Sequence, residues 1–313
     1  MPGNWMDYPS ASTPAVVEGR IYFVGSAAVA YCLDAKDGRT IWETKTLGAK
    51  HDHNRSSSPL LLDGRMIFST DSRILALDAK SGEIVWSNAQ AVGKEASPAI
   101  WRLGDKTNIL CLAVAVLEGY DYYHSKFLCL DPADGRVVWS APVSGSASTP
   151  VISGDLAVFC TADKTNGLAA YRISAERAKL LWSVPLMDWS TSVVVLGKHV
   201  YAIGGANTSD GFGEGKGRAV CVDSETGQVV WNEVLGKGAE LASPVLADGK
   251  IIAEVGPWLY LIQADPAKYT LLGKANLDLA KWTSPALADG KVFLRSRQSV
   301  VCYDLEARKA NAP

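Results

Sequence analysis

Three of the four histidines of the chain fall in two short polar segments. His51 and His53 are separated by one residue, and His124 ends a segment that also contains Asp121. In an extended segment, residues two apart point to the same side. Imidazole is a frequent metal ligand and a general acid or base near neutral pH. His51, His53 and His124 are therefore candidates for a metal or acid/base site, although no metal site is assigned, since solvated loop residues are the other interpretation.

Aromatic side chains accompany the third of these histidines. Tyr120, Tyr122 and Tyr123 flank Asp121 in the segment that ends at His124. Such rings can stack on a sugar or a peptide, or they can pack against their own loop. A third long segment, 204–218, is rich in glycine, but no GKS or GKT follows it, so it does not match a phosphate-binding loop.

The elements that would position these segments are predicted by an internal repeat. A Ser/Thr-Pro anchor, followed by apolar residues and a glycine turn, recurs at intervals of 39 to 52 residues. This is about the length of a four-stranded propeller blade. Short apolar runs with turns between them predict strands, and no helical period persists. The anchors are Ser12-Thr13-Pro14, Ser58-Pro59, Ser97-Pro98, Ser148-Thr149-Pro150, a degenerate Thr191-Ser192-Val193, Ser243-Pro244 and Ser284-Pro285.

A second motif accompanies the repeat. It contains a small residue, Asp two residues later, Gly four further on, and Trp four beyond that. We expect the Asp to bind turn amides, the Gly to adopt positive φ, and the Trp to cover a neighbouring blade. The four complete copies are Cys32/Asp34/Gly38/Trp42, Ala76/Asp78/Gly82/Trp86, Cys129/Asp131/Gly135/Trp139 and Cys221/Asp223/Gly227/Trp231.

These repeats resemble the tryptophan-docking repeats of the propellers that are similar to pyrroloquinoline-quinone (PQQ) enzymes, a family that includes quinoprotein alcohol dehydrogenases and BamB-type assembly lipoproteins. The resemblance covers essentially the whole chain and implies an all-β, seven-bladed β-propeller of four-stranded antiparallel blades. The motif is degenerate in blade 4, lacks its Trp in blade 6, and breaks off in blade 7, which has Arg308 at the Gly position.

The N-terminal segment is predicted to supply the strand that blade 7 lacks. Trp5 to Pro14 resembles Trp139 to Pro150 with two residues removed. Pairing of this segment onto blade 7 would close the ring and leave no unpaired edge strand there. We therefore expect one propeller domain over 1–313, with blades near 11–48, 55–93, 95–145, 146–188, 189–238, 240–281, and 282–313 together with 1–10.

Strand alternation predicts which face of the propeller could bind a ligand. The first and third turns of each blade share one face, and the second loops and inter-blade links share the other, where most of the long segments fall. Binding residues are often carried on long loops of a rigid scaffold. Residues just before the anchors should surround the channel mouth. The predicted ligand-binding face comprises His51, His53, Arg55, Tyr120, Asp121, Tyr122, Tyr123, His124, Trp189, Glu240 and Trp282.

Two further expectations concern the core. Cys32, Cys129, Cys221 and Cys302 occupy one repeat position on different blades, too far apart for a disulfide. Cys111 and Cys160 lie in the predicted second strands of blades 3 and 4, so all six cysteines are predicted to be buried free thiols. None forms the adjacent pair associated with PQQ contact in the dehydrogenases. Glu254 and Arg295 occupy matching second-strand positions of blades 6 and 7, which suggests an ion pair between the blades.

Composition narrows the function. The formal net charge of −2 and pI of about 6.1 give no basic excess for a nucleic acid. No stretch of about 20 apolar residues predicts a membrane span, and no leader is visible at the N-terminus. By resemblance, we expect a bacterial protein of the periplasm, cell envelope or exterior, a monomer whose leader is removed, although a cytoplasmic location is the alternative.

Two functions fit these features. The first is a non-catalytic scaffold that binds a protein, peptide or carbohydrate through its long-loop face. The second is a PQQ-dependent oxidoreductase or another enzyme that uses the same face. The family dehydrogenases hold PQQ and Ca²⁺ in an eight-bladed ring, and their ligand residues have no residue-by-residue counterpart here, so neither cofactor is expected.

Overall fold

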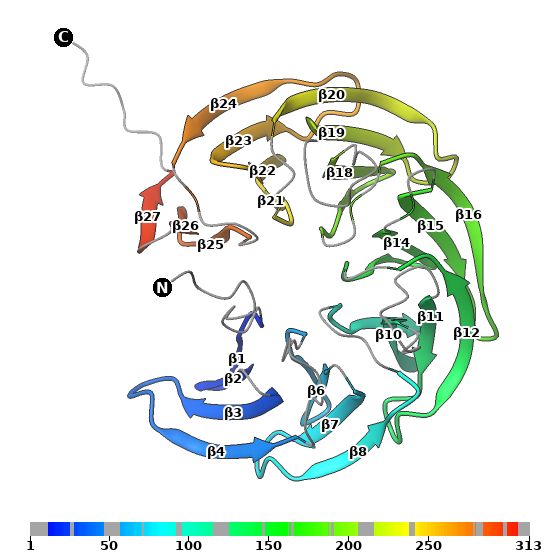
Figure 1. Cartoon of the computed structure of the whole chain (residues 1–313), viewed down its shortest axis with the longest axis vertical. Coiled ribbons are helices and arrows are strands. Elements are labelled where there is room, and N and C mark those ends of the chain that lie inside the picture. The colour runs from blue at the N-terminus through cyan, green and yellow to red at the C-terminus, as the bar shows by residue number, and fades with distance from the viewer. Residues whose placement is uncertain are drawn as a thin grey trace, which may run out of the picture. The chain divides into compact units, whose positions relative to one another are not determined.

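The structure is a computed structural model. It describes residues 12–25, 28–46, 57–70, 72–91, 96–114, 125–145, 148–161, 163, 166–186, 188, 191–205, 216–237, 242–277, 279, 284–296 and 299–305. Strands are the only extended regular elements of these residues, and they form seven sheets (Figure 1). Each sheet is a meander whose neighbouring strands are consecutive in the chain. The fold is the predicted all-β, seven-bladed β-propeller.

The first compact part, residues 1–163 and 167–183, contains the first four blades. Blade 1 contains β1 (Ala15–Val17), β2 (Arg20–Val24), β3 (Val29–Asp34) and β4 (Thr40–Lys45). Blade 2 contains β5 (Leu60–Leu62), β6 (Arg65–Ser69), β7 (Ile74–Asp78) and β8 (Ile84–Asn88). Blade 3 contains β9 (Ala99–Leu103), β10 (Lys106–Val114), β11 (Ser125–Leu130) and β12 (Val137–Val143), and blade 4 contains β13 (Val151–Ser153), β14 (Leu156–Cys160), β15 (Leu168–Ile173) and β16 (Ala178–Val184).

The second compact part, residues 164–166 and 184–313, contains the remaining blades. Blade 5 contains β17 (Val194–Leu196), β18 (His199–Gly205), β19 (Lys216–Asp223) and β20 (Val229–Lys237). Blade 6 contains β21 (Val245–Ala247), β22 (Lys250–Val255), β23 (Trp258–Gln263) and β24 (Leu271–Asn276). Blade 7 contains β25 (Ala286–Ala288), β26 (Lys291–Arg295) and β27 (Val300–Asp304), and its predicted fourth strand, residues 1–10, lies outside the described residues.

Tight turns connect the first two strands of most blades. In blade 2, Asp63 and Gly64 have φ of 48° and 73°, and the same conformation recurs at Asp248-Gly249 and Asp289-Gly290. Two consecutive residues with positive φ are typical of the type I′ turn, whose twist matches that of a β-hairpin. The Asp-Gly pairs of the repeat therefore fix the register of the inner strands.

The core lies between successive blades, because alternate residues of each strand face opposite neighbours. Tyr22, Val24 and Cys32 of blade 1 pack with Met66 and Phe68 of blade 2. The other face of blade 2 packs against blade 3, and blade 3 against blade 4. In the second part, one core joins blades 5 and 6, and a smaller one joins blades 6 and 7.

The anchors link the blades through a chain of hydrogen bonds that the sequence did not predict. The amide of Thr13 donates to Ser58 Oγ (2.9 Å), the amide of Ser58 to Ser97 Oγ (3.0 Å), and the amide of Ser97 to Thr149 Oγ1 (3.3 Å). In the second part, Ser192 donates to Ser243 Oγ and Ser243 to Ser284 Oγ. In each of these pairs, an anchor hydroxyl accepts a hydrogen bond from the anchor amide of the preceding blade.

We expect Ser97→Ala to destabilise the protein by about 1–2 kcal/mol, because the amide of Ser58 would lose its acceptor. Ser97→Thr keeps a hydroxyl at this position, as Thr149 does naturally, and should cost much less. Urea unfolding of both variants measures the difference. Equal free energies of unfolding for the Ala and Thr variants would show that the hydrogen bond contributes nothing.

Candidate binding site

All of the residues predicted for the ligand-binding face lie outside the described residues. They are His51, His53, Arg55, Tyr120, Asp121, Tyr122, Tyr123, His124, Trp189, Glu240 and Trp282. The strands that flank these segments are described, so the structure locates the ends of the sheets from which they leave.

The long connections leave each blade at the end opposite its tight turns. In blade 3, the β10–β11 ladder ends at the pair of Val114 and Ser125. The segment that contains His124 connects these two residues. In blade 1, Lys45 at the end of β4 lies opposite Val29 at the start of β3, so the link containing His51 leaves from the same end of its blade. We call this side of each blade, bounded by the second loop and the inter-blade link, the second-loop side.

Unpaired buried polar atoms gather on the second-loop side. Among the described residues, four buried side-chain atoms have no hydrogen-bond partner: Ser69 Oγ, Arg73 Nε, Ser125 Oγ and Glu254 Oε2. Ser69 ends β6, Arg73 precedes β7, Ser125 begins β11, and Glu254 is the penultimate residue of β22. Each therefore adjoins the connection between the second and third strands of its blade. Unpaired buried polar groups are uncommon in native proteins and call for a specific explanation.

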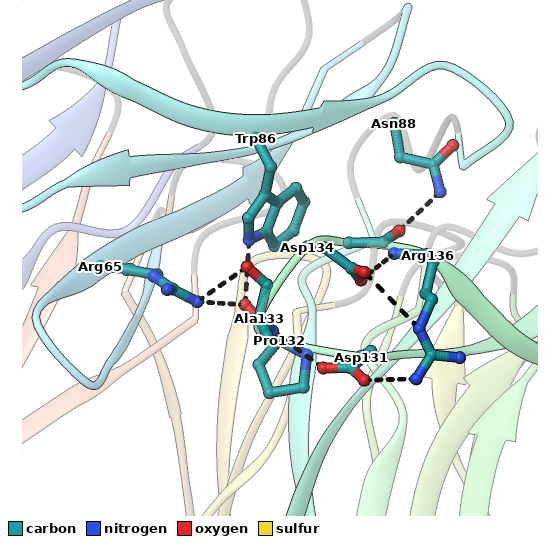
Figure 2. Close-up of polar contacts among 9 residues, drawn as sticks. Arg65, Trp86, Asn88, Asp131, Pro132, Ala133, Asp134 and Arg136 are labelled. Atoms are coloured by element: carbon teal, nitrogen blue, oxygen red, sulfur yellow. Dashed lines mark hydrogen bonds and ion pairs between the residues drawn. The ribbon is translucent and has the colours of Figure 1, made fainter.

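In the blades with a complete docking motif, the motif pairs polar groups of the third turn on the opposite side, as in blade 3 (Figure 2). Asp131 Oδ1 accepts from the amide of Ala133 (2.9 Å), and its other oxygen accepts from Arg136 (2.7 Å). Asp34, Asp78 and Asp223 bind turn amides in the same way. Hydrogen bonds to the charged form stabilise it. Accordingly, backbone amides lower the pKa of Asp34 and Asp78, and Thr226 lowers that of Asp223.

The tryptophan of each complete motif reaches the next blade, as predicted. Trp86 Nε1 donates to the carbonyl of Pro132 at 2.9 Å, and Arg65 reaches the carbonyls of Pro132 and Ala133 (Figure 2). Asn88 Nδ2 adds a bond of 2.7 Å to the Gly135 carbonyl. Equivalent indole bonds join Trp42 to Ala79, Trp139 to Ser174 and Trp231 to Asp265.

The positive φ predicted for the motif glycines is confirmed in all four complete copies. The values are 75° at Gly38, 76° at Gly82, 74° at Gly135 and 75° at Gly227. In each turn, the glycine amide donates to the carbonyl of the motif aspartate, as Gly227 does to Asp223 at 2.9 Å. A left-handed residue is needed to close this turn, and glycine adopts that conformation without steric cost.

In blades 2 and 3, the glycine of the motif serves the preceding blade as well as its own turn. A Cβ placed on Gly135 would lie 2.4 Å from the Trp86 ring. Gly82 lies similarly close to the Trp42 ring, 2.7 Å from such a Cβ. The sequence predicted the positive φ but not this second requirement, although the recurrence of Trp and Gly in successive blades was a signal for it.

Blade 6 lacks the docking tryptophan of the regular blades. In blades 1, 2, 3 and 5 the docking tryptophan lies directly opposite the small residue of the third strand, as in the pair Cys32 and Trp42. In blade 6, Leu261 lies opposite Gly273, so Gly273 occupies the tryptophan position. A Cβ placed on Gly273 would meet nothing within 4 Å. Blade 6 therefore has no indole at this position to dock on blade 7.

The predicted ion pair between Glu254 and Arg295 is wrong. Ile251, Ala253 and Val255 of β22 pack toward blade 5, so Glu254 points toward blade 7. Val292 and Leu294 of β26 pack toward blade 6, so Arg295 points away from it. Matching positions on successive blades face the same way around the repeat, and such side chains cannot meet. Glu254 is 2% exposed, and its burial raises its pKa to about 8.

All six cysteines are free thiols, as predicted. Five of them are buried, and desolvation raises the pKa of Cys111 and of Cys129 to about 12. Contrary to the prediction, Cys302 is exposed on β27 in the described three-stranded sheet of blade 7. Cys302 lies opposite Phe293, and both side chains are on the face of the sheet that points away from blade 6.

Neither a metal centre nor a membrane span is found in the described part of the chain. No three His, Cys, Asp or Glu side chains among the described residues could together hold a metal ion. Within the same residues, no helix has the length and apolar character needed to cross a bilayer.

Comparison with known proteins identifies the family. A family model described as outer membrane protein assembly factor BamB matches residues 4–110 and 114–310. The chain belongs to this family. The BamB of Moranella endobia is 23% identical over 295 residues, covering 91% of this chain and 69% of that protein. The crystal structure of BamB from Moraxella catarrhalis, 18% identical, superposes with a TM-score of 0.70 over 96% of this chain and 83% of that one.

The BamB family is also related to quinoproteins. The quinohemoprotein alcohol dehydrogenase ADH-IIG of Pseudomonas putida is 33% identical over 89 residues, which is 26% of this chain and 12% of that enzyme. The sequence similarity to this enzyme therefore covers a small part of either protein, whereas that to the Moranella BamB covers most of both. The solved structure of ADH-IIG, 13% identical, shares the fold, with a TM-score of 0.63 over 95% of this chain and 65% of that one.

Proposed function

We propose that this protein is a non-catalytic scaffold of the bacterial cell envelope that binds a protein partner through the second-loop side of its blades. The observation that carries the proposal is that the long connections containing His51 and His124 leave blades 1 and 3 from this side, and long loops on a rigid scaffold often carry binding residues. On the opposite side the turns are tight, and motif aspartates such as Asp131 already bind their own turns. Membership in the BamB family supports the envelope location and a protein as the partner.

The predicted ligand-binding residues belong to this proposal. His51, His53 and Arg55 precede blade 2, and the segment from Tyr120 to His124 connects β10 to β11. Tyrosines supply large contact areas at low entropic cost, and such residues dominate many protein interfaces. A peptide or carbohydrate ligand would use the same aromatic and polar groups, and crosslinking to protein or to glycan distinguishes these ligands.

Site-specific photo-crosslinking in living bacterial cells tests the proposal. We expect a photoreactive residue at Ser72, on the second-loop side of blade 2, to form discrete protein adducts. The same residue at Asp134, in the third turn of blade 3, is the matched control and should form several-fold fewer. Adducts from both positions alike, or from Asp134 alone, would contradict the proposed binding side. Adducts with glycan and not with protein at Ser72 would overturn the protein partner.

The quinoprotein alternative is tested with purified protein, PQQ and Ca²⁺. Saturable micromolar binding together with quinone-dependent dye reduction would contradict the scaffold function. We expect neither, because the PQQ- and Ca²⁺-binding residues of the dehydrogenases have no residue-by-residue counterpart in this sequence.

A further inference from the structure

The interface between blades 6 and 7, which we call the 6/7 seam, differs from the described seams of the first part. Three buried side chains, Leu279, Val292 and Leu294, form its core, and Leu259 packs against them. The indole that docks on the next blade elsewhere is replaced by Gly273. Docking tryptophans contribute both apolar area and a hydrogen bond to a seam. The 6/7 seam lacks both contributions of a docking tryptophan and should therefore be less stable than the seams that have one.

A carboxyl group is buried in this seam. Glu254 lies directly opposite Leu259 on β23, so the two side chains share the face that looks toward blade 7. The side chain is 2% exposed, and Oε2 has no hydrogen-bond partner. An ionised carboxylate in such surroundings is costly, so the neutral acid is favoured.

No opposite charge compensates Glu254 from the described strands packed against it. On β22–β24, the ionisable side chain that shares its face is Lys250, at the far end of β22, and it bonds to the carbonyl of Asp248. On β25–β27, the ionisable side chain on the facing side is Tyr303, opposite Val292 at the far end of the ladder. Arg295 faces away. Among the described residues, burial is accordingly the only cause that raises the pKa of Glu254.

We propose that the 6/7 seam is a proton-controlled joint, closed while Glu254 is the neutral acid and opened when that side chain ionises. Separation of blade 7 from blade 6 would expose Glu254 to water, where the carboxylate is stable. The weak core and the missing indole allow this seam to open while blades 5 and 6 stay packed through Tyr201, Cys221 and Tyr260.

The sign of the pH effect follows from the two states. In the closed seam the pKa of Glu254 is about 8, and in the open seam it should return to about 4.5. The closed state therefore binds one more proton between these values. The equilibrium constant for closure is largest below about pH 4.5, falls about tenfold per pH unit as the pH rises toward 8, and is constant above that.

Hydrogen exchange of the whole chain tests this proposal. After correction for intrinsic exchange, we expect the protection of the β26 amides to fall roughly a hundredfold between pH 5 and pH 7, while the β19 amides of blade 5 change little. In Glu254→Gln, which keeps the shape without the charge, the β26 protection should be independent of pH. Glu233→Gln, an exposed position on β20, is the matched control and should behave as the wild type.

Three results would overturn the proposal. The wild-type β26 amides could show no pH dependence, which needs no variant to observe. The β19 and β26 amides could lose protection in the same proportion, which would indicate unfolding of the whole second part. Glu254→Gln could retain the wild-type dependence, which would assign the titration to another group.

Discussion

Replacement of Gly135 by alanine should destabilise the protein by about 2–5 kcal/mol. A residue with a Cβ in the left-handed region costs about 1–2 kcal/mol, and Gly135 has φ of 74°. The new Cβ would also lie 2.4 Å from the Trp86 ring, which must then move. Forcing extra volume into a packed site typically costs a further 1–3 kcal/mol. Chemical denaturation measures the sum.

Gly38→Ala is a matched control for this prediction. Gly38 has nearly the same φ, 75°, but a Cβ placed there would meet nothing within 4 Å. Its substitution should therefore cost the backbone strain alone, about 1–2 kcal/mol. In a double-mutant cycle, Trp86→Ala should relieve the extra cost of Gly135→Ala, because the two residues would no longer collide. Equal costs at Gly38 and Gly135 would show that the indole does not require a glycine.

Much of the fold could be predicted from the sequence, because each blade repeats the same local chemistry. Gly135 and Gly227 adopt positive φ, Asp131 binds turn amides, and Trp86 reaches blade 3. All of these follow from residue type and spacing within about 50 residues. The anchor hydrogen bonds, such as that from Ser58 to Ser97, were not predicted, because spacing alone does not show that the amide of one anchor lies beside the hydroxyl of the next.

The seam between blades 6 and 7 shows where sequence reasoning failed. Glu254 and Arg295 have opposite charges and matching positions, which suggested an ion pair. Matching positions, however, point the same way around the repeat. Two side chains could meet across the seam only if one of them were shifted by one residue along its strand, onto the other face. The blade against which each face of a strand packs is fixed only when the sheets assemble, so the charges of two matching positions do not reveal it. The candidate ligand-binding residues stay a prediction, because they lie outside the described residues.

The N-terminal segment remains the predicted fourth strand of blade 7, and its removal should have a large effect. In regular blades, the docking tryptophan lies directly opposite the small residue of the third strand, as Trp139 does with Cys129. The matching pair in blade 7 is Trp5 with Cys302. If Trp5 is buried there, Trp5→Ala should destabilise the protein by about 3–5 kcal/mol. Deletion of residues 1–10 should cost at least as much, since β27 would become an unpaired edge.

The Cys302 thiol reports this pairing directly. Cys302 is exposed on the described sheet, whereas the other five thiols are buried and should react slowly. With Trp5 packed over it, Cys302 in the full chain should react slowly with a thiol reagent, and in the deletion variant at least tenfold faster. Asn4→Ala, one residue from the predicted contact, is the control and should react as the wild type. Equal labelling of the full chain and the deletion variant would mean that the N-terminal segment does not cover Cys302. The strand that completes blade 7 would then have to come from elsewhere.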